Sequence, residues 1–215
     1  MTTAIIPFRK GSKGVPGKNT RVVAGAPLWE WSLKAAVDSI RVDRLAVSTD
    51  IYGLRDEGPG FPPVVPRPPE LATDTASLDA ALVHAVNYLE LPTEEIVVVL
   101  QPTVPVRRPG LIDDCVAMFE RFPAARSLLT ANRLHFVWHG ASGAMINGPR
   151  VNRQEMAQDQ CHFEEDGSVY VVRAGDLRIH GNRCAQPGIL FETERTVDID
   201  TEADMALAEF LLSRD

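Results

Sequence analysis

Cysteine is scarce in this sequence, and the few cysteines present form no binding pattern. The three residues, Cys115, Cys161 and Cys184, are far apart, with no C-x-x-C pair and no zinc-type His/Cys spacing. We therefore expect free thiols that fill the core of a protein in a reducing cytosol. A chain of 215 residues buries roughly 70% of its unfolded surface, so it needs neither a disulfide nor a structural metal to fold.

Long apolar runs and an excess of basic residues are also missing. No stretch reaches the roughly 18 apolar residues that a membrane span requires, and the start, MTTAII, lacks the charged region of a signal peptide. With 22 basic and 29 acidic residues the formal net charge is −7, which argues against binding to a nucleic-acid backbone. The sequence thus predicts a cytoplasmic protein with neither a membrane nor a nucleic acid as its partner.

Strand-like and helix-like segments alternate along the whole chain. The strand-like segments are 4–8, 44–48, 95–100, 128–130 and 168–172, and the helix-like ones are 28–39, 75–89, 110–121 and 202–212. This alternation predicts a single α/β domain, residues 1–215, with a mainly parallel sheet and helices on both faces. Residues 134–163 are irregular. Ligands bind beyond the carboxyl ends of such strands, so residues 9–19, 49–50 and 101–107 are expected on one rim.

Residues 9–19, RKGSKGVPGKN, follow the first predicted strand and combine glycines with cations. The three glycines let the backbone bend and bring N–H groups close to anionic oxygens. Arg9, Lys10, Lys13 and Lys18 would neutralise a triphosphate. The pattern is neither a P-loop, G-x-x-x-x-G-K-[ST], nor a dinucleotide fingerprint, G-x-G-x-x-G. It indicates anion binding, with a solvated basic turn as the alternative.

The loop resembles A-R-x-G-S-K-G-x-P-x-K-N, the signature of the acylneuraminate cytidylyltransferase (CMP-sialic acid synthetase) family. Three further segments resemble family motifs in the same order: RPPELATDTAS at 67–77, LQPTVPVR at 100–107 and VDIDTEAD at 197–204. The resemblance implies a three-layer, Rossmann-like nucleotidyltransferase (GT-A-like) fold with a small β segment for dimerisation. It also implies transfer of CMP from CTP to the anomeric hydroxyl of a nonulosonic (sialic-type) acid, with release of pyrophosphate.

By resemblance, CTP is bound by the loop and by the second motif. The expected phosphate and ribose contacts come from Arg9, Gly11, Ser12, Lys13, Gly14, Lys18 and Asn19. Arg67 resembles the residue that reads cytosine, whose O2 and N3 accept hydrogen bonds from a guanidinium; packing against the adjacent prolines is the alternative. Ser77 is implied in base binding, and capping of the following helix is equally open. Leu78 stands where the family often has a second serine.

Asp198 and Asp200 are two residues apart on an extended segment, so both face the same side. Paired carboxylates beside a triphosphate suit Mg²⁺, a hard ion with oxygen ligands, and by resemblance these two hold the metal. Capping of the helix that begins near Glu202 is an alternative role, although Thr201 can serve as that cap. By resemblance, Arg9, Lys18 and Asp200 are the predicted catalytic residues. Fixed cations such as Arg9 and Lys18 near the α-phosphorus would stabilise the transition state, and Asp200 would act by holding the metal ion.

The acceptor half of the site is where the sequence departs from the family. By resemblance Gln101 contacts the acceptor or the α-phosphate, and Arg153 is a candidate partner for an acceptor carboxylate or phosphonate. Glu164 and Asp166 stand where the family has Arg and Asn. The family forms homodimers through an irregular β segment, here about 135–165. A CTP:phosphonate or KDO-type cytidylyltransferase and a non-catalytic nucleotide-binding module remain alternatives.

Overall fold

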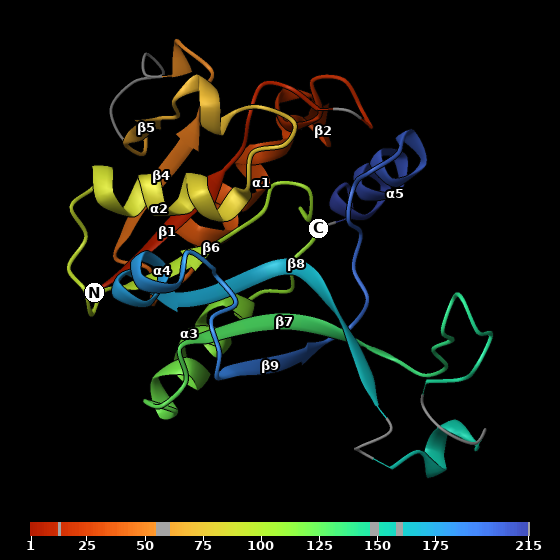
Figure 1. The fold of residues 1–215 in the computed structure, drawn as a ribbon. Helices are drawn as coiled ribbons and strands as arrows, with labels where there is room; N and C mark the ends of the chain where they lie inside the picture. The colour runs from red at the N-terminus through yellow and green to blue at the C-terminus, as the bar shows by residue number, and fades with distance from the viewer. Residues whose placement is uncertain (13, 55–60, 147–150, 158–160, 215) are drawn as a thin grey trace.

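The computed structural model describes residues 1–12, 14–54, 61–146, 151–157 and 161–214. Its centre is a seven-stranded sheet in the order β5-β4-β1-β6-β8-β7-β9 (Figure 1). The strands are β1 (Thr2–Pro7), β4 (Arg44–Thr49), β5 (Val64–Pro66), β6 (Ile96–Val99), β7 (Ser127–Leu134), β8 (His162–Arg173) and β9 (Gly188–Thr193). β8 runs antiparallel to β6 and β7, and the other neighbouring strands of this sheet are parallel. The prediction of a mainly parallel α/β sheet is therefore confirmed.

Helices cover both faces of the sheet and give the three expected layers (Figure 1). On one face lie α2 (Leu78–Tyr88) and α4 (Ala174–His180), and on the other α1 (Leu28–Val37) and α3 (Leu111–Arg121). The central strand β1 points Ile5 toward α2 and Ile6 toward α1 and α3, and both side chains are fully buried. Burial on both faces explains why the central strands are continuous apolar runs. None of the described helices has the length and apolarity to cross a membrane.

The last helix, α5 (Glu202–Leu212), lies beside the layers and packs against the hairpin of β2 (Val22–Val23) and β3 (Ala26–Pro27). A third apolar cluster contains Val15, Ile199 and Met205 and joins residues from the two ends of the chain. The helix begins at a capping box in which Thr201 is the N-cap. The N-terminal loop and the segment before α5 are thus fixed against each other.

The sequence pattern predicts neither α4 and β9 nor the two-residue strands β2 and β3, and two strands are longer than predicted. α4 has seven residues, too few for a helical period to stand out. β9 is an edge strand whose residues are alternately exposed and half-buried. β8 begins at His162 and β7 reaches Leu134. Their outer halves are polar or partly exposed, so an apolar run marks only the buried halves.

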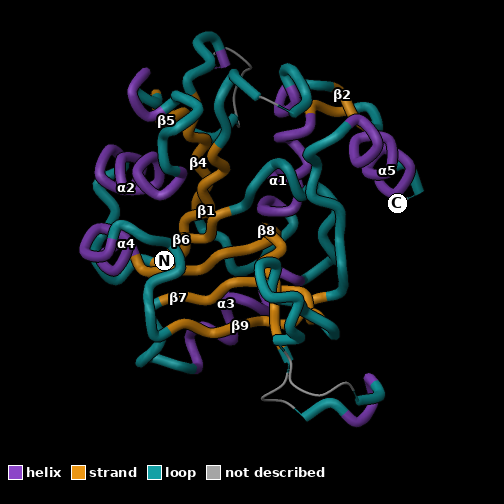
Figure 2. Tube along the Cα trace, turned by 45° about the vertical axis from the view of Figure 1, so that its right-hand side comes forward, coloured by secondary structure: helices purple, strands orange, loops and turns teal. Residues whose placement is uncertain are grey.

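The described residues of 135–161, called the arm below, extend away from the body of the molecule (Figures 1 and 2). Its described residues include an isolated antiparallel bridge between Trp138 and Met145 and one 3-10 turn, η4 (Arg153–Glu155). Trp138 and Ile146 are 55% and 47% exposed. The described part of the arm agrees with the irregular, hairpin-like segment that the sequence predicts.

Candidate active site

A cleft of about 320 Å³ opens beyond the carboxyl ends of β1, β5 and β6, where the sheet order switches on either side of β1. Most of the predicted site residues line it: Arg9, Gly11, Ser12, Gly14, Lys18, Asn19, Arg67, Ser77, Gln101 and Asp200. Lys13 and the side chain of Arg153 lie outside what the structure describes, and Asp198 is not among the lining residues. The structure therefore brings together most of the residues implied in CTP binding, although they come from four separate motifs.

The loop after β1 folds back on itself and buries two of its polar side chains. The Lys18 N–H donates to the Val15 carbonyl at 3.1 Å, and Asn19 Nδ2 donates to the Arg9 carbonyl at 3.0 Å. Lys18 and Asn19 open the short helix η1 (Lys18–Thr20) and are each 8% exposed. A solvated turn would leave both side chains in water. The burial of both side chains therefore favours an anion-binding loop over a solvated basic turn.

The C-terminal segment closes one side of the loop. Lys18 Nζ donates to the Ile199 carbonyl and lies 3.3 Å from Asp200 Oδ1. Gly14 lies so close to this segment that a Cβ there would collide with the Asp200 carbonyl oxygen. At the other side, Arg9 Nη1 lies 2.6 Å from Asp74 Oδ1. These contacts thus hold the Arg9 guanidinium and the Lys18 ammonium group at fixed positions beside the cleft.

Asp198 and Asp200 share one face of an extended segment, as their spacing predicts. Ile199 between them is fully buried, and both aspartates are exposed. Desolvation raises the pKa of Asp198, a hydrogen bond from Thr103 opposes the rise, and the nearby Asp200 charge adds to it. Thr201 caps α5, which leaves these two carboxylates without a capping role. Their oxygen atoms are a donor set of the kind that Mg²⁺ prefers.

Arg67 is the buried cation of the cleft, with 6% of its surface exposed. Its Nη2 donates to the Ser48 carbonyl at 2.9 Å, and among the described residues its buried Nε has no hydrogen-bond partner. Burial lowers the pKa of Arg67 to about 10, so the guanidinium stays charged at neutral pH. A buried guanidinium with an unused donor beside a ligand cleft is suited to reading acceptor atoms on a ligand.

Comparisons with known proteins agree with this geometry. A family model described as cytidylyltransferase matches residues 3–136. A CMP-N,N'-diacetyllegionaminic acid synthase of Legionella pneumophila is 30% identical, over 97% of this chain and 95% of its own. The chain belongs to the acylneuraminate cytidylyltransferase family. An N-acylneuraminate cytidylyltransferase of Escherichia coli is 35% identical over 95% of this chain, which spans about half, 50%, of that relative.

A solved structure confirms the fold of this cytidylyltransferase. A CMP:2-keto-3-deoxy-manno-octonic acid synthetase complexed with CTP superposes with a TM-score of 0.74 at 17% identity. The similarity covers 99% of this chain and 98% of that chain. The three-layer nucleotidyltransferase fold is thus confirmed, and the family assignment makes the chain a nucleotidyltransferase enzyme.

Ser77 and Gln101 border the cleft in different ways. Ser77 is the N-cap of α2, and its Oγ accepts from the Asp79 N–H at 3.1 Å. The capping role left open by the sequence is therefore present in this cytidylyltransferase. Gln101 follows β6, and its Nε2 donates to the Tyr170 hydroxyl at 3.0 Å. One side of the cleft is thus connected to β8.

Sequence reasoning gave no role to three polar residues around Gln101. Arg107 is half-buried, and its guanidinium donates to the Gln101 carbonyl, to the Ser168 carbonyl and to Ser32 Oγ. Burial lowers the pKa of Arg107 to about 9. Tyr170 ends the short stretch GSVY at 167–170, which weakly resembles the family pattern and could have marked it, whereas Arg183 follows the unpredicted helix α4 and has no comparable signal. These residues surround Gln101 at one side of the cleft.

Proposed function

We propose that this cytidylyltransferase transfers CMP from CTP to the anomeric hydroxyl of a nonulosonic (sialic-type) acid and releases pyrophosphate. The observation that carries the proposal is a single cleft that gathers Lys18, Arg67 and Asp200. Such a cleft offers a cation for phosphates, a buried guanidinium for a base and a carboxylate for a metal ion. The choice of acceptor class is supported by the two relatives above, which are named for legionaminic acid and for N-acylneuraminate.

In the proposed reaction the acceptor hydroxyl oxygen bonds to the α-phosphorus, the bond to the pyrophosphate oxygen breaks, and the hydroxyl proton is lost. Negative charge gathers on the oxygens around that phosphorus and on the leaving pyrophosphate. Arg9 and Lys18 place positive charge along the cleft, and preorganised charge of this kind stabilises the transition state more than the ground state. A triphosphate would compete with Asp74 for the Arg9 guanidinium.

Mg²⁺ fits Asp198 and Asp200, and we propose them as its protein ligands. Both carboxylates are exposed, and the Asp200 side chain, 79% exposed, lines the cleft. The described residues contain no group of three acidic, His or Cys side chains that could hold a metal. Two carboxylate ligands are typical of Mg²⁺ when its other ligands are phosphate oxygens and water. When bound, Mg²⁺ would neutralise charge on the triphosphate.

We also propose a homodimer that pairs through the arm. Trp138 and Ile146 place apolar surface on a segment that stands away from its own chain. Such surface is commonly covered by a partner. The short helix η4 (Arg153–Glu155) belongs to the same arm. We propose that any contact between Arg153 and the acceptor is made in the site of the partner subunit.

Pyrophosphate release from CTP with Mg²⁺ tests the proposed function directly. The assay compares nonulosonic acids, KDO-type octulosonic acids and phosphonates as acceptors, with UTP in place of CTP as the nucleotide control. We expect turnover to be highest with a nonulosonic acid. Highest turnover with an octulosonic acid or a phosphonate would contradict the proposed acceptor. Intact CTP binding with no turnover on any acceptor would contradict the reaction itself.

Replacing Arg67 with leucine is expected to lower kcat/KM for CTP by about 10- to 100-fold, the loss of one charge-assisted hydrogen bond. The preference for CTP over UTP should fall with it, because leucine offers neither pyrimidine a donor. The measurement is kcat/KM for both nucleotides at a saturating acceptor concentration. Arg108→Leu is the matched control, since Arg108 pairs with Asp114 and lies outside the cleft. An unchanged preference in Arg67→Leu would contradict base reading by Arg67.

A further inference from the structure

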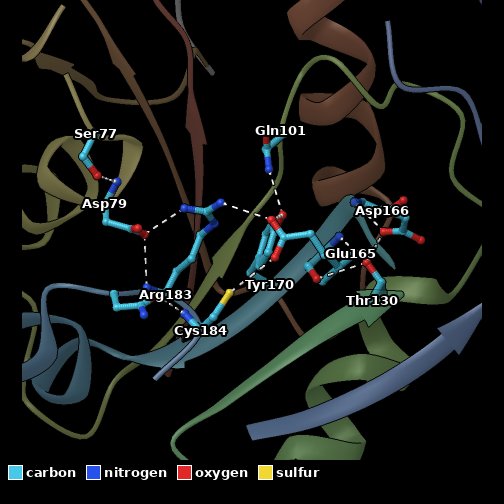
Figure 3. Close-up of polar contacts among 12 residues, drawn as sticks. Ser77, Asp79, Gln101, Thr130, Glu165, Asp166, Tyr170, Arg183 and Cys184 are labelled. Atoms are coloured by element: carbon cyan, nitrogen blue, oxygen red, sulfur yellow. Dashed lines mark hydrogen bonds and ion pairs between the residues drawn. The ribbon is translucent and has the colours of Figure 1, made fainter. Parts of the chain in front are cut away.

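A bulge in β8 places an acidic side chain beside Gln101 and Tyr170. Leu129 of β7 pairs with Tyr170 of β8, and Ala131 of β7 pairs with Glu165 of β8. The two pairs are thus two residues apart along β7 but five residues apart along β8. Residues five apart in a regular strand face opposite sides of the sheet. The extra residues let Glu165 reach the same side as Tyr170, and Figure 3 shows the two side chains together.

The bulge is built by Asp166 and Gly167. Gly167 has a φ of 75°, in the left-handed region that glycine adopts without cost. Asp166 is buried and turns away from the cleft. Its carboxylate accepts hydrogen bonds from the Ser168 N–H at 2.8 Å and from the hydroxyls of Thr130 and Thr193, both at 2.5 Å. Asp166, which departs from the family pattern, is thus held inside the protein, and the neighbouring Glu165 is the acidic residue that lies on the side of Tyr170.

Glu165, Tyr170 and Gln101 form a chain of hydrogen bonds whose direction is fixed. Tyr170 donates its only hydroxyl proton to Glu165 Oε1 at 3.1 Å, because an ionised carboxylate can only accept. The Tyr170 oxygen must then accept, and it does so from Gln101 Nε2 at 3.0 Å. This fixes which way the Gln101 amide points. Among the described residues, none donates to Gln101 Oε1, so that oxygen is available to a ligand in the cleft.

Arg183 holds the other end of this chain in place (Figure 3). Its guanidinium lies over the Tyr170 ring at 4.6 Å and 3.6 Å from Glu165 Oε1. Its Nη1 lies 2.9 Å from Asp79 Oδ1, in the first turn of α2, which Ser77 caps at the edge of the cleft. Arg183 thus links Glu165 and the Tyr170 ring to the start of α2.

We infer that Glu165 is a positioning residue for the acceptor substrate: acting through Tyr170, it orients Gln101 so that the amide oxygen accepts a hydrogen bond from an acceptor hydroxyl or N–H. The inference rests on the proposed function, since it takes Gln101 as an acceptor contact. Glu165 itself touches neither CTP nor the reacting atoms. Loss of its carboxylate frees Tyr170 to donate to Gln101 and the amide to turn over, which would present a donor in place of an acceptor.

A double-mutant cycle on Glu165→Ala and Tyr170→Phe tests this coupling. The readouts are KM and kcat/KM for the acceptor with the highest turnover, and KM for CTP. Each single variant is expected to lower kcat/KM for the acceptor by about 2- to 10-fold, the worth of one neutral hydrogen bond, and to leave KM for CTP within twofold. The double variant should match Tyr170→Phe alone, because in this inference the effect of Glu165 on Gln101 passes through the Tyr170 hydroxyl.

Two further variants separate positioning from a structural role. Glu165→Gln keeps an oxygen that accepts from Tyr170 and should recover most of the activity lost in Glu165→Ala. Glu164→Ala removes a neighbouring exposed carboxylate whose contact is Arg195 at 3.7 Å, and it should leave the acceptor KM unchanged. Additive losses in the cycle, or equal changes in KM for CTP and for the acceptor, would overturn the inference alone. A wild-type enzyme that is inactive with every acceptor would overturn the proposed function together with it.

Discussion

Replacing Asp200 with asparagine is expected to lower kcat by a factor on the order of 10²–10³ while the chain stays folded. Asparagine keeps the size of the side chain but removes the charge that, with Asp198, would hold Mg²⁺ beside the triphosphate. The side chain is 79% exposed, so its loss of charge should change the melting temperature by less than about 2 °C. The measurements are pyrophosphate release at saturating CTP and thermal denaturation.

Asp204→Asn is the matched control, with the opposite pattern expected. Asp204 lies outside the cleft lining, and its Oδ2 accepts from the Thr201 N–H at 2.8 Å and from the Asp200 N–H at 3.2 Å. The hydrogen bond from the Thr201 hydroxyl, at 2.7 Å, and these two backbone hydrogen bonds lower the pKa of Asp204, so its charge stabilises the start of α5. We expect Asp204→Asn to lower the melting temperature by roughly 2–4 °C with kcat nearly unchanged. Retained kcat in Asp200→Asn would contradict the metal assignment.

The predictable part of the fold is the part whose burial leaves a mark in the sequence. The run at 95–100 predicts β6 (Ile96–Val99), because a strand covered on both faces is apolar throughout. Thr201 predicts the start of α5 at Glu202, because a capping hydroxyl precedes the helix. Neither mark exists for α4, which is short, or for β9, which lies at the edge of the sheet.

The donor side of the site could be predicted for a different reason. Most of its residues lie within the continuous stretch 9–19, and the rule for the carboxyl ends of parallel strands brings that stretch near Gln101. The side that we propose for the acceptor depends on a register shift in β8 and on Arg183, which follows α4 and lies over the Tyr170 ring. A one-residue change of register reverses the face of a side chain, and the sequence alone does not determine such a shift.

Replacing Lys18 with methionine is expected to lower kcat/KM for CTP by a factor on the order of 10²–10³. Methionine keeps the apolar stem in its buried place and removes the ammonium group that lies between the Ile199 carbonyl and Asp200. The carbonyl loses its donor, so the free energy of unfolding should fall by about 1–3 kcal/mol. Initial rates at subsaturating CTP measure the first effect, and urea denaturation measures the second.

Lys10→Met tests whether the position of the charge matters more than its presence. Lys10 belongs to the same loop, but it is exposed and outside the cleft lining, and its backbone N–H is the group that donates to Asp50, at 2.7 Å. Long-range attraction alone would make the two variants lose equally, and that loss would vanish at 1 M salt, where the screening length is about 3 Å. Because Lys18 is fixed against Ile199, we expect its loss to exceed that of Lys10 by at least tenfold and to persist at high salt. Equal and salt-sensitive losses would show that the loop attracts CTP without taking part in the transfer.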